Sequence, residues 1–276
     1  MAKLAVAQMV SGESVDANLD AVERLVEEAA NSEAQLLLLP ENFALLDSRA
    51  LINLARDEVK TQRIQKLLST LAKKYNLWLV AGSVPVLAEG DKGIEDKVWA
   101  SCLVFDNQGS LKASYNKVHL FDVDVADAHS AYRESDFIQA GSDLVTVDAP
   151  FGCIGLAICY DLRFPEQFQR LRQMGADIIT VPSAFTYVTG EAHWEVLLRA
   201  RAIENQCYVL AANQGGEHSP SRKSWGHSMI VDPWGEVLAV REPAGKGLVL
   251  AEVDLKVVQD RRDAMPVMQH RAKVGF

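Results

Sequence analysis

The chain is constrained most by how its short apolar runs alternate with segments of helical periodicity. Residues 3–10 form an apolar run that ends at Ser-Gly, which is typical of a buried strand. Over residues 16–30, apolar side chains recur at helical spacing with glutamates on the opposite side, which predicts an amphipathic helix. The next apolar run, Leu36–Leu39, is all leucine and stops at Pro40. This order predicts a strand–helix–strand unit.

Further along the chain, strands are joined in a second way. Three strand-like runs each meet a short turn that ends in glycine and is followed by another strand, at residues 106–109, 148–152 and 232–235. Asp, Asn and Pro favour turns and Gly supplies positive φ, so each segment predicts a hairpin. The remaining pattern predicts helices around residues 64–71, 165–174 and 191–205, and strands over 77–84, 178–181 and 208–212.

Strand–helix–strand units mixed with hairpins predict mixed sheets. Many strands with only four substantial helices predict two sheets packed together with the helices outside. No segment has the composition of a linker, a repeat or a low-complexity tract. We therefore expect an α/β fold in a single domain over residues 1–276.

Composition and charge narrow the classes of partner. The net charge is -9 and the pI about 5.2, which argues against nucleic acid because that affinity comes from Lys and Arg at phosphates. The apolar runs are far shorter than the roughly 20 residues that span a bilayer, and Met1 leads directly into a strand-like run, so we expect no signal peptide and no membrane partner.

The four cysteines form no C-x-x-C pair, which indicates reduced thiols and a cytoplasmic protein. The histidines have no zinc-site spacing, so we expect no metal and no other cofactor.

Two charged residues follow apolar strands, where α/β folds hold binding groups. Glu41 comes directly after four leucines and a proline. Burial there would raise the pKa of its carboxyl and suit it to proton transfer near neutral pH, although a surface glutamate that opens a loop fits the pattern as well. Lys117 has apolar flanks, which favour a buried, fixed positive charge over the solvated position of most lysines. The neighbouring His119 is better interpreted as making a local hydrogen bond than as a base.

The run from Gly152 to Glu166 contains the third candidate. Period-2 alternation places Cys153, Gly155, Ala157 and Cys159 on one unusually small face. The strand is predicted to end at Cys159, and Pro165 favours a helix start. A thiol at such a turn stands clear of the sheet beside free backbone N–H groups, as a nucleophile with an oxyanion hole requires. We interpret Cys159 as that nucleophile and the other three cysteines as structural.

Together these residues resemble the nitrilase superfamily of carbon–nitrogen hydrolases, whose signature is a Glu–Lys–Cys triad. The matches are L-P-E-N around Glu41, N-K-V-H-L around Lys117 and C-Y-D-L-R-F-P-E from Cys159. A fourth segment, Y-R-E-S, is similar to the one that carries the family's second active-site glutamate, here Glu134. The resemblance implies a four-layer α-β-β-α sandwich. It also implies a homodimer or higher homo-oligomer joined through the helix after Cys159 and the helix at residues 191–205.

The resemblance also implies a mechanism. Glu41 acts as general base while Cys159 attacks an amide carbonyl, and a thioester forms that water then hydrolyses. Lys117 and the backbone N–H of Tyr160 stabilise the oxyanion, and Glu134 holds Lys117 and orients the substrate.

A closer likeness, to the deaminated-glutathione amidase branch, comes from P-S-A-F-T at residues 182–186, from residues 189–204, and from G-H-S-M and P-V-M-Q-H-R nearer the end. It implies a small-molecule amide substrate that carries carboxylates, cleaved to α-ketoglutarate and cysteinylglycine. The expected substrate-binding residues are Arg163, Phe185 and Thr186, with Arg199 or Arg201 as weaker candidates for the carboxylate.

Three other functions stay open at this point. The first is an ω-amidase that acts on α-ketoglutaramate, since members of this branch are similar to the ω-amidases. The second is a metal-dependent phosphoesterase of similar sandwich architecture, which would need clustered Asp, His and Asn ligands. The third is a silent interaction module, which the presence of all four motif residues disfavours.

Overall fold

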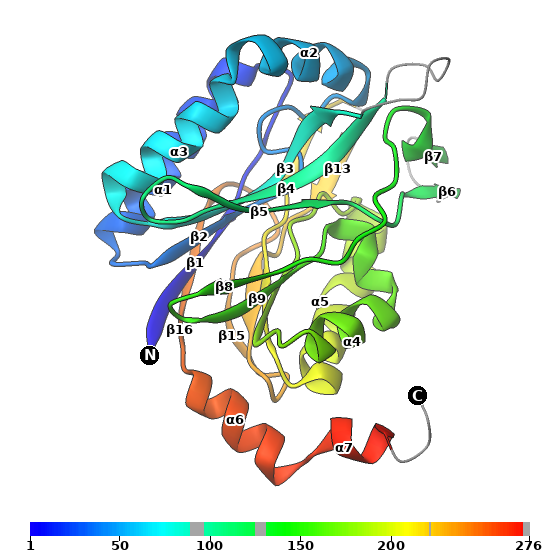
Figure 1. Cartoon of the computed structure of the whole chain (residues 1–276). Coiled ribbons are helices and arrows are strands. Elements are labelled where there is room, and N and C mark those ends of the chain that lie inside the picture. The colour runs from blue at the N-terminus through cyan, green and yellow to red at the C-terminus, as the bar shows by residue number, and fades with distance from the viewer. Residues whose placement is uncertain (89–96, 125–130, 221, 273–276) are drawn as a thin grey trace.

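Two six-stranded sheets form the centre of the protein (Figure 1). The computed structural model describes residues 1–88, 97–124, 131–220 and 222–272. In the first sheet β1 pairs in parallel with β2 and β2 with β3, whereas β16, β4 and β5 join antiparallel to their neighbours. Its strand order is β16 (Gly247–Val253), β1 (Ala2–Gln8), β2 (Leu36–Leu39), β3 (Trp78–Leu87), β4 (Val98–Phe105) and β5 (Leu111–Asn116).

The second sheet has the same mixture. Its central strands β9, β10 and β11 are parallel, and the outer strands are antiparallel to their neighbours. Its strand order is β15 (Val237–Val240), β14 (Met229–Val231), β11 (Tyr208–Ala211), β10 (Ile178–Thr180), β9 (Gly152–Leu156) and β8 (Thr146–Ala149). Two small ribbons, β12 (Gly215–Ser219) with β13 (Arg222–Trp225) and β6 (Asp122–Asp124) with β7 (Ala131–Arg133), stand apart from the sheets.

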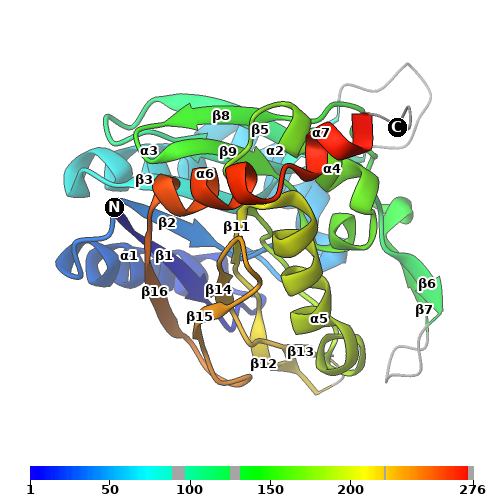
Figure 2. The same cartoon turned by 90° about the horizontal axis from the view of Figure 1, so that it is seen from below.

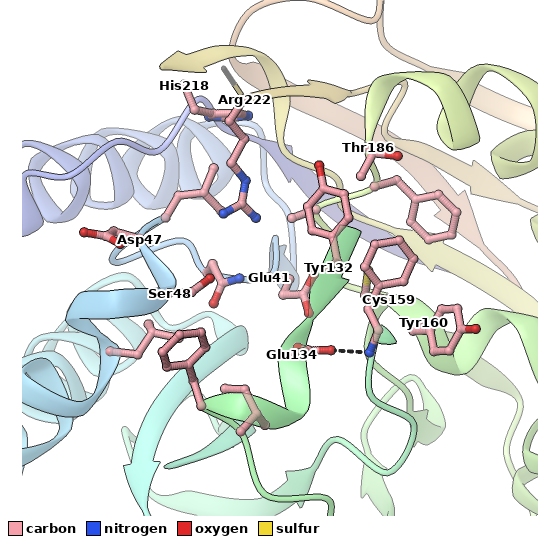
Figure 3. Close-up of a pocket in the computed structure, with 18 of the residues that line it drawn as sticks. Glu41, Asp47, Ser48, Tyr132, Glu134, Cys159, Tyr160, Thr186, His218 and Arg222 are labelled. Atoms are coloured by element: carbon pink, nitrogen blue, oxygen red, sulfur yellow. Dashed lines mark hydrogen bonds between the residues drawn. The ribbon is translucent and has the colours of Figure 1, made fainter. Parts of the chain in front are cut away.

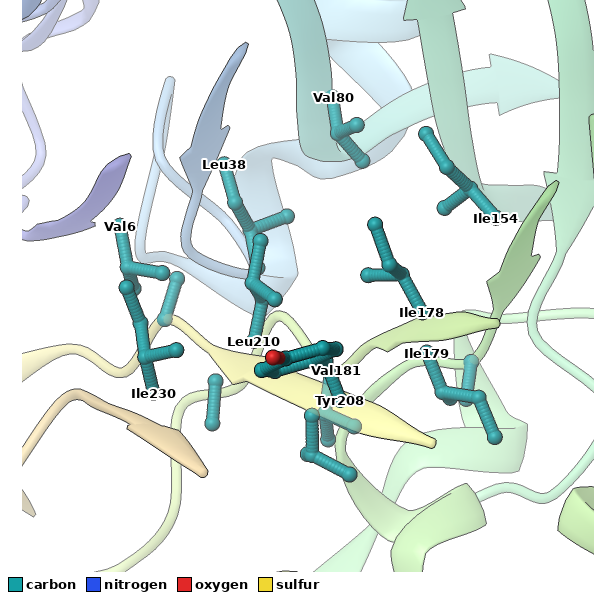
Figure 4. Close-up of a cluster of buried hydrophobic side chains, with 14 of the residues drawn as sticks. Val6, Leu38, Val80, Ile154, Ile178, Ile179, Val181, Tyr208, Leu210 and Ile230 are labelled. Atoms are coloured by element: carbon teal, nitrogen blue, oxygen red, sulfur yellow. The ribbon is translucent and has the colours of Figure 1, made fainter. Parts of the chain in front are cut away.

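The main core lies between the two sheets. Val6 and Leu38 of the first sheet face Ile154 and Ile178 of the second in one fully buried cluster (Figure 4). Because side chains alternate along a strand, the intervening residues of the first sheet, such as Leu37, point the other way and pack against helices. Strands that are buried on both faces need continuous apolar runs, which accounts for the all-leucine strand β2.

Helices cover the outer faces of both sheets (Figure 1). The helices α1 (Val15–Asn31) and α3 (Arg63–Tyr75) share a core cluster with the first sheet. The helices α4 (Pro165–Gln173) and α5 (Tyr187–Asn205) pack on the second sheet. A Cβ on Gly155 of β9 would lie 3.2 Å from side-chain atoms of α4, so the small face of this strand permits close packing of that helix. The layers confirm the predicted α-β-β-α sandwich.

The prediction of four substantial helices was wrong, because the described residues form seven α-helices. The additional ones are α2 (Leu51–Thr61), α6 (Leu255–Ala264) and α7 (Val267–Ala272), and α5 begins four residues before the predicted start. Helix α6 lies near β11 in Figure 2, and its Arg262 pairs at 2.7 Å with Asp177, which directly precedes β10. Contacts of this kind connect residues far apart in the chain, so local periodicity does not reveal them.

The three predicted hairpins are confirmed as β4–β5, β8–β9 and β14–β15. In each turn the glycine has positive φ, at 78° for Gly109, 127° for Gly152 and 84° for Gly235. Within the described ranges, no helix is both long and apolar enough to cross a membrane. The expectation of a single domain over residues 1–276 stays a prediction.

Candidate active site

The three predicted catalytic residues each follow the carboxyl end of a strand. Glu41 comes two residues after β2, Lys117 directly after β5 and Cys159 three residues after β9. A parallel bridge between Met9 and Gln214 joins the two sheets at this edge. The strand ends of both sheets therefore converge, which brings residues distant in sequence into one place.

Lys117 lies at the centre of a buried charge cluster. Its side chain is 1% exposed, and its Nζ lies 2.8 Å from Glu41 Oε1 and 2.8 and 2.9 Å from the two oxygens of Glu134. Burial alone would lower the pKa of Lys117, but the charges of Glu134 and Glu41 outweigh it and hold that pKa well above its ordinary value. The ammonium is therefore a permanent positive charge.

Glu134 begins a short 3-10 helix (Glu134–Asp136) after β7, and it also accepts a hydrogen bond from the backbone N–H of Phe121 at 2.7 Å. Burial raises the pKa of Glu134, Lys117 lowers it and Glu41 raises it, and the net pKa lies above the ordinary carboxyl value of 4.5. Two carboxylates around one ammonium leave the cluster with a net negative charge when both are ionised.

Cys159 is held in a conformation that few side-chain-bearing residues adopt. Its φ is +49°, at the start of a 3-10 helix (Cys159–Arg163) between β9 and α4. Its N–H donates to the carbonyl oxygen of Pro182 at 2.9 Å. Burial raises the pKa of the thiol well above its ordinary value; the charge of Glu41 and a hydrogen bond to Glu41 add to the rise, while Lys117 and the N–H of Ala184 oppose it. The resting sulfur is therefore a protonated thiol that needs a base.

The backbone around Cys159 also offers donors. Helix first turns leave N–H groups free, and no backbone acceptor for the N–H of Tyr160 is found within the described residues. The N–H of Ala184, after β10, faces the sulfur. Tyr160 was predicted as an oxyanion donor, whereas Ala184 was missed although it lies in the P-S-A-F-T segment, because a backbone N–H carries no side-chain signal.

The turn that carries Cys159 depends on Asp161, a residue that the sequence analysis did not single out. This fully buried carboxylate accepts hydrogen bonds from the hydroxyl of Tyr115 at 2.6 Å and the N–H of Ile158 at 2.8 Å. It also accepts from the N–H of His119 at 3.0 Å, and its Oδ1 lies 2.8 Å from His119 Nδ1. Asp161 thus connects the Cys159 turn to the segment that carries Lys117. His119 therefore makes a hydrogen bond as expected, although its partner lies 42 residues away and is not local in the sequence.

Gln214 supports the base in a similar way and was also missed. Its Nε2 donates to the backbone oxygen of Glu41 at 3.0 Å and to the hydroxyl of Ser11 at 2.9 Å, and all three residues are buried. An amide after strand β11 has no distinctive local pattern. Only the junction between the sheets gives Gln214 this position.

A cavity of about 580 Å³ opens above the charge cluster, a volume within the usual range for small-molecule sites. Glu41, Glu134 and Cys159 lie together at its base in Figure 3. Phe185 and Thr186, which were predicted to bind substrate, both line the cavity. The structure therefore brings together the triad, the second glutamate and two of the three predicted substrate-binding residues.

Arg163 is not among the residues that line this cavity. Its guanidinium lies over the rings of Tyr160 and Phe185, with centroid distances of 5.8 and 5.5 Å, and 3.4 Å from His193 Nδ1. The weaker candidates are engaged in ion pairs, Arg199 with Glu195 and Arg201 with Glu204. In the part of the chain that the structure describes, no group of three or more His, Cys, Asp or Glu side chains could hold a metal.

Comparisons with known proteins agree with this fold and site. The Carbon-nitrogen hydrolase family profile matches residues 3–263. A protein from Yersinia enterocolitica named deaminated glutathione amidase is 44% identical over 274 residues, which cover 99% of this chain and 94% of the relative. Each of these similarities extends over nearly the whole chain.

Two crystal structures give the same result. The NitFhit protein of C. elegans has a TM-score of 0.88 and 40% identity, and the match covers 98% of this chain but 64% of that longer one. Saccharomyces cerevisiae Nit3, described as a member of branch 10 of the nitrilase superfamily, has a TM-score of 0.82 and 31% identity over 98% of this chain and 97% of its own. The sandwich is thus that of nitrilase-superfamily enzymes. The chain belongs to the carbon–nitrogen hydrolase family.

Proposed function

We propose that this enzyme hydrolyses a small carboxylate-bearing amide, deaminated glutathione, to α-ketoglutarate and cysteinylglycine. One observation carries the chemistry: a buried ammonium, Lys117, lies 2.8 Å from Glu41 and from Glu134 in a cavity that Cys159 also lines. A thiol, a base and a cation at one site are the groups that acyl transfer requires. The substrate is suggested by the name of the relative from Yersinia enterocolitica.

In the first half of the reaction, Glu41 takes the proton of the Cys159 thiol as the sulfur attacks the amide carbonyl. A base is needed because burial keeps this thiol protonated. The developing oxyanion accepts hydrogen bonds from Lys117 and from the backbone N–H of Tyr160. An ammonium has three N–H donors, so one is left for the oxyanion when the two oxygens of Glu134 share another.

The tetrahedral intermediate then breaks its carbon–nitrogen bond. Glu41 returns the proton to the leaving amine, cysteinylglycine departs and the acyl group remains as a thioester on Cys159. In the second half, Glu41 takes a proton from water as the water attacks the thioester. The new intermediate releases α-ketoglutarate, and the sulfur recovers the proton from Glu41.

Glu134 has a separate role in this scheme. Each time Glu41 becomes protonated, Lys117 loses one of its two negative partners. Glu134 contacts the ammonium with both oxygens, so the buried positive charge stays paired throughout the cycle. We therefore assign Glu134 as a positioning residue for Lys117. Phe185 and Thr186, in the cavity wall, are the side chains we expect to contact substrate.

The cellular compartment and the oligomeric state are also part of the proposal. Four free cysteines fit a reducing compartment, the cytoplasm.

A homodimer or higher homo-oligomer is supported by apolar side chains left in solvent on the two helices that flank the second sheet. On α5, Val196 is 68% and Ile203 51% exposed, and Met174 at the end of α4 is 46% exposed.

The test of the function is a comparison of substrates. Purified enzyme would be given deaminated glutathione, α-ketoglutaramate or a simple aliphatic amide, with α-ketoglutarate or ammonia release as the readout. We expect the highest kcat/KM for deaminated glutathione. A preference for α-ketoglutaramate would instead establish an ω-amidase, and turnover of neither acidic amide would overturn the proposal.

A further inference from the structure

Two arginine side chains that line the cavity have no charged partner among the residues that the structure describes. Arg222 begins β13, and Arg49 lies in the short 3-10 helix (Ser48–Ala50) that precedes α2. Within the described residues, no carboxylate lies within 4.0 Å of either guanidinium, and no acceptor is found for their side-chain N–H groups. Figure 3 shows Arg222 projecting into the cavity, whose base holds Glu41 and Cys159.

The other arginine in the cavity wall, Arg133, is already engaged. It pairs with Asp124 at 2.8 Å and donates to the backbone oxygens of Val123 and Tyr132 at 3.1 and 2.8 Å. Its donors are therefore used to hold the β6–β7 ribbon. Arg49 and Arg222 differ because their donors are left for a group that enters the cavity.

Within the described residues, the two other carboxylates of the cavity wall, Asp47 and Glu13, form no ion pair with these arginines. Asp47 accepts a hydrogen bond from the backbone N–H of Arg49 at 3.0 Å and so caps the 3-10 helix. Glu13 is exposed to solvent. Among the cations of the cavity wall, Lys117 and Arg133 pair with carboxylates, whereas Arg49 and Arg222 have no ion-pair partner within the described residues and can therefore pair with an anion that enters.

His218, the neighbour of Arg222, adds no positive charge to this part of the cavity. Its Nδ1 lies 2.8 Å from the backbone oxygen of Ser11, which can only accept, so Nδ1 carries the proton. Burial lowers the pKa of His218, the bond to Ser11 opposes that effect, and the charge of Arg222 lowers the pKa further. The net effect lowers the pKa of His218 below 6.5, so the neutral ring is the main form at pH 7.

We propose that Arg222 and Arg49 form the site that binds a carboxylate of the substrate, and that they select acidic amides over neutral ones. The guanidinium fork matches the geometry of a carboxylate and keeps its charge at every relevant pH. This inference rests on the proposed function, since it takes the substrate to be a carboxylate-bearing amide. It assigns to these two residues the role that the sequence analysis expected of Arg163.

The first test separates substrate binding from chemistry. Arg222→Gln and Arg49→Gln would be compared with wild type and with Arg24→Gln, which removes an exposed arginine on the outer helix α1. One lost charge-assisted hydrogen bond corresponds to about tenfold or more in affinity. We expect KM for deaminated glutathione to rise by about that factor in the two cavity variants and to stay at the wild-type value in Arg24→Gln. We expect kcat, and KM for neutral butyramide, to stay close to wild type, and Arg222→Lys to restore part of the affinity.

Two further substrates identify which carboxylate is bound. α-Ketoglutaramate carries only the carboxylate of the acyl half, and deaminated glutathione with an amidated glycine lacks the carboxylate of the leaving half. If the cavity variants raise KM for both, the acyl carboxylate is bound. If they raise KM for deaminated glutathione alone, the leaving-half carboxylate is bound. Wild-type KM values for every acidic substrate in both cavity variants would overturn the proposal.

A second readout does not depend on turnover. Isothermal titration of glutarate, a simple dicarboxylate, into Cys159→Ala protein should give a Kd that is about tenfold lower than that of the Cys159→Ala/Arg222→Gln protein. Equal affinities would exclude the carboxylate site. Because this measurement needs no reaction, it separates a failed carboxylate site from a failed choice of substrate. Equal thermal melting temperatures of the variants would establish that the differences are local.

Discussion

Replacing Glu134 with glutamine should leave the fold intact and slow the reaction. The carboxylate contacts Lys117 with both oxygens, at 2.8 and 2.9 Å, and accepts from the N–H of Phe121 at 2.7 Å. A glutamine has one oxygen and one NH₂ group, so one of these donors would face another donor. The substitution therefore removes at least one charge-assisted hydrogen bond.

The expected size of the effect follows from that loss. A hydrogen bond to a charged group contributes about 1.5–3 kcal/mol, which corresponds to roughly 10–150-fold in kcat if the bond matters most in the transition state. The loss should appear there because protonation of Glu41 during the reaction would leave Lys117 without any ionised partner. KM should change much less, since in the resting enzyme Glu41 still pairs with Lys117.

The assay is steady-state release of α-ketoglutarate from deaminated glutathione by Glu134→Gln, wild type and Asp136→Asn. Asp136 is a matched control because it lies in the same 3-10 helix, is exposed and loses the same charge. We expect wild-type kcat from Asp136→Asn only. If Glu134→Gln had the same kcat as the control, the role of Glu134 in pairing Lys117 would be refuted.

Three further outcomes are expected. Burial and Glu41 hold the pKa of Glu134 above 4.5, so this carboxylate takes up its proton early as the pH falls. The acid limb of kcat/KM should therefore have its midpoint above pH 4.5, and a midpoint at or below that value would contradict the role of ionised Glu134. Asp161→Asn should lower the free energy of unfolding by about 1–3 kcal/mol in urea titrations, since an amide cannot accept from all the donors that face this fully buried carboxylate; an unchanged midpoint would disprove its structural role. Val196→Asp should shift the protein towards monomer in light scattering, and an unaltered mass would place the interface elsewhere.

The reactive residues that follow strands were easier to predict from the sequence than the contacts between distant side chains. Glu41, Lys117 and Cys159 stand out because each follows an apolar run, and the structure brings all three to one edge of the sandwich. Asp161 could not be recognised in this way, since a carboxylate beside a cysteine has the same local pattern whether it is buried or solvated. Its role depends on Tyr115 and His119, which are 46 and 42 residues away.

The substrate-binding cations were the least predictable part of the site. Arg163 was favoured because it is close to Cys159 in sequence, yet it does not line the cavity, and its guanidinium lies over the rings of Tyr160 and Phe185. Arg49 and Arg222 lie far apart in the chain and belong to none of the motifs that marked the site. Only the assembled fold brings their charges to one place, so local pattern carries no signal for them.

The most direct test of the account is to find the covalent intermediate. Wild-type enzyme would be mixed with deaminated glutathione, quenched in acid within a few turnovers, digested and analysed by mass spectrometry. We expect one α-ketoglutaryl group attached to Cys159, with no adduct and no turnover in Cys159→Ala. An acyl group on any other residue, or turnover at the wild-type rate by Cys159→Ala, would contradict it.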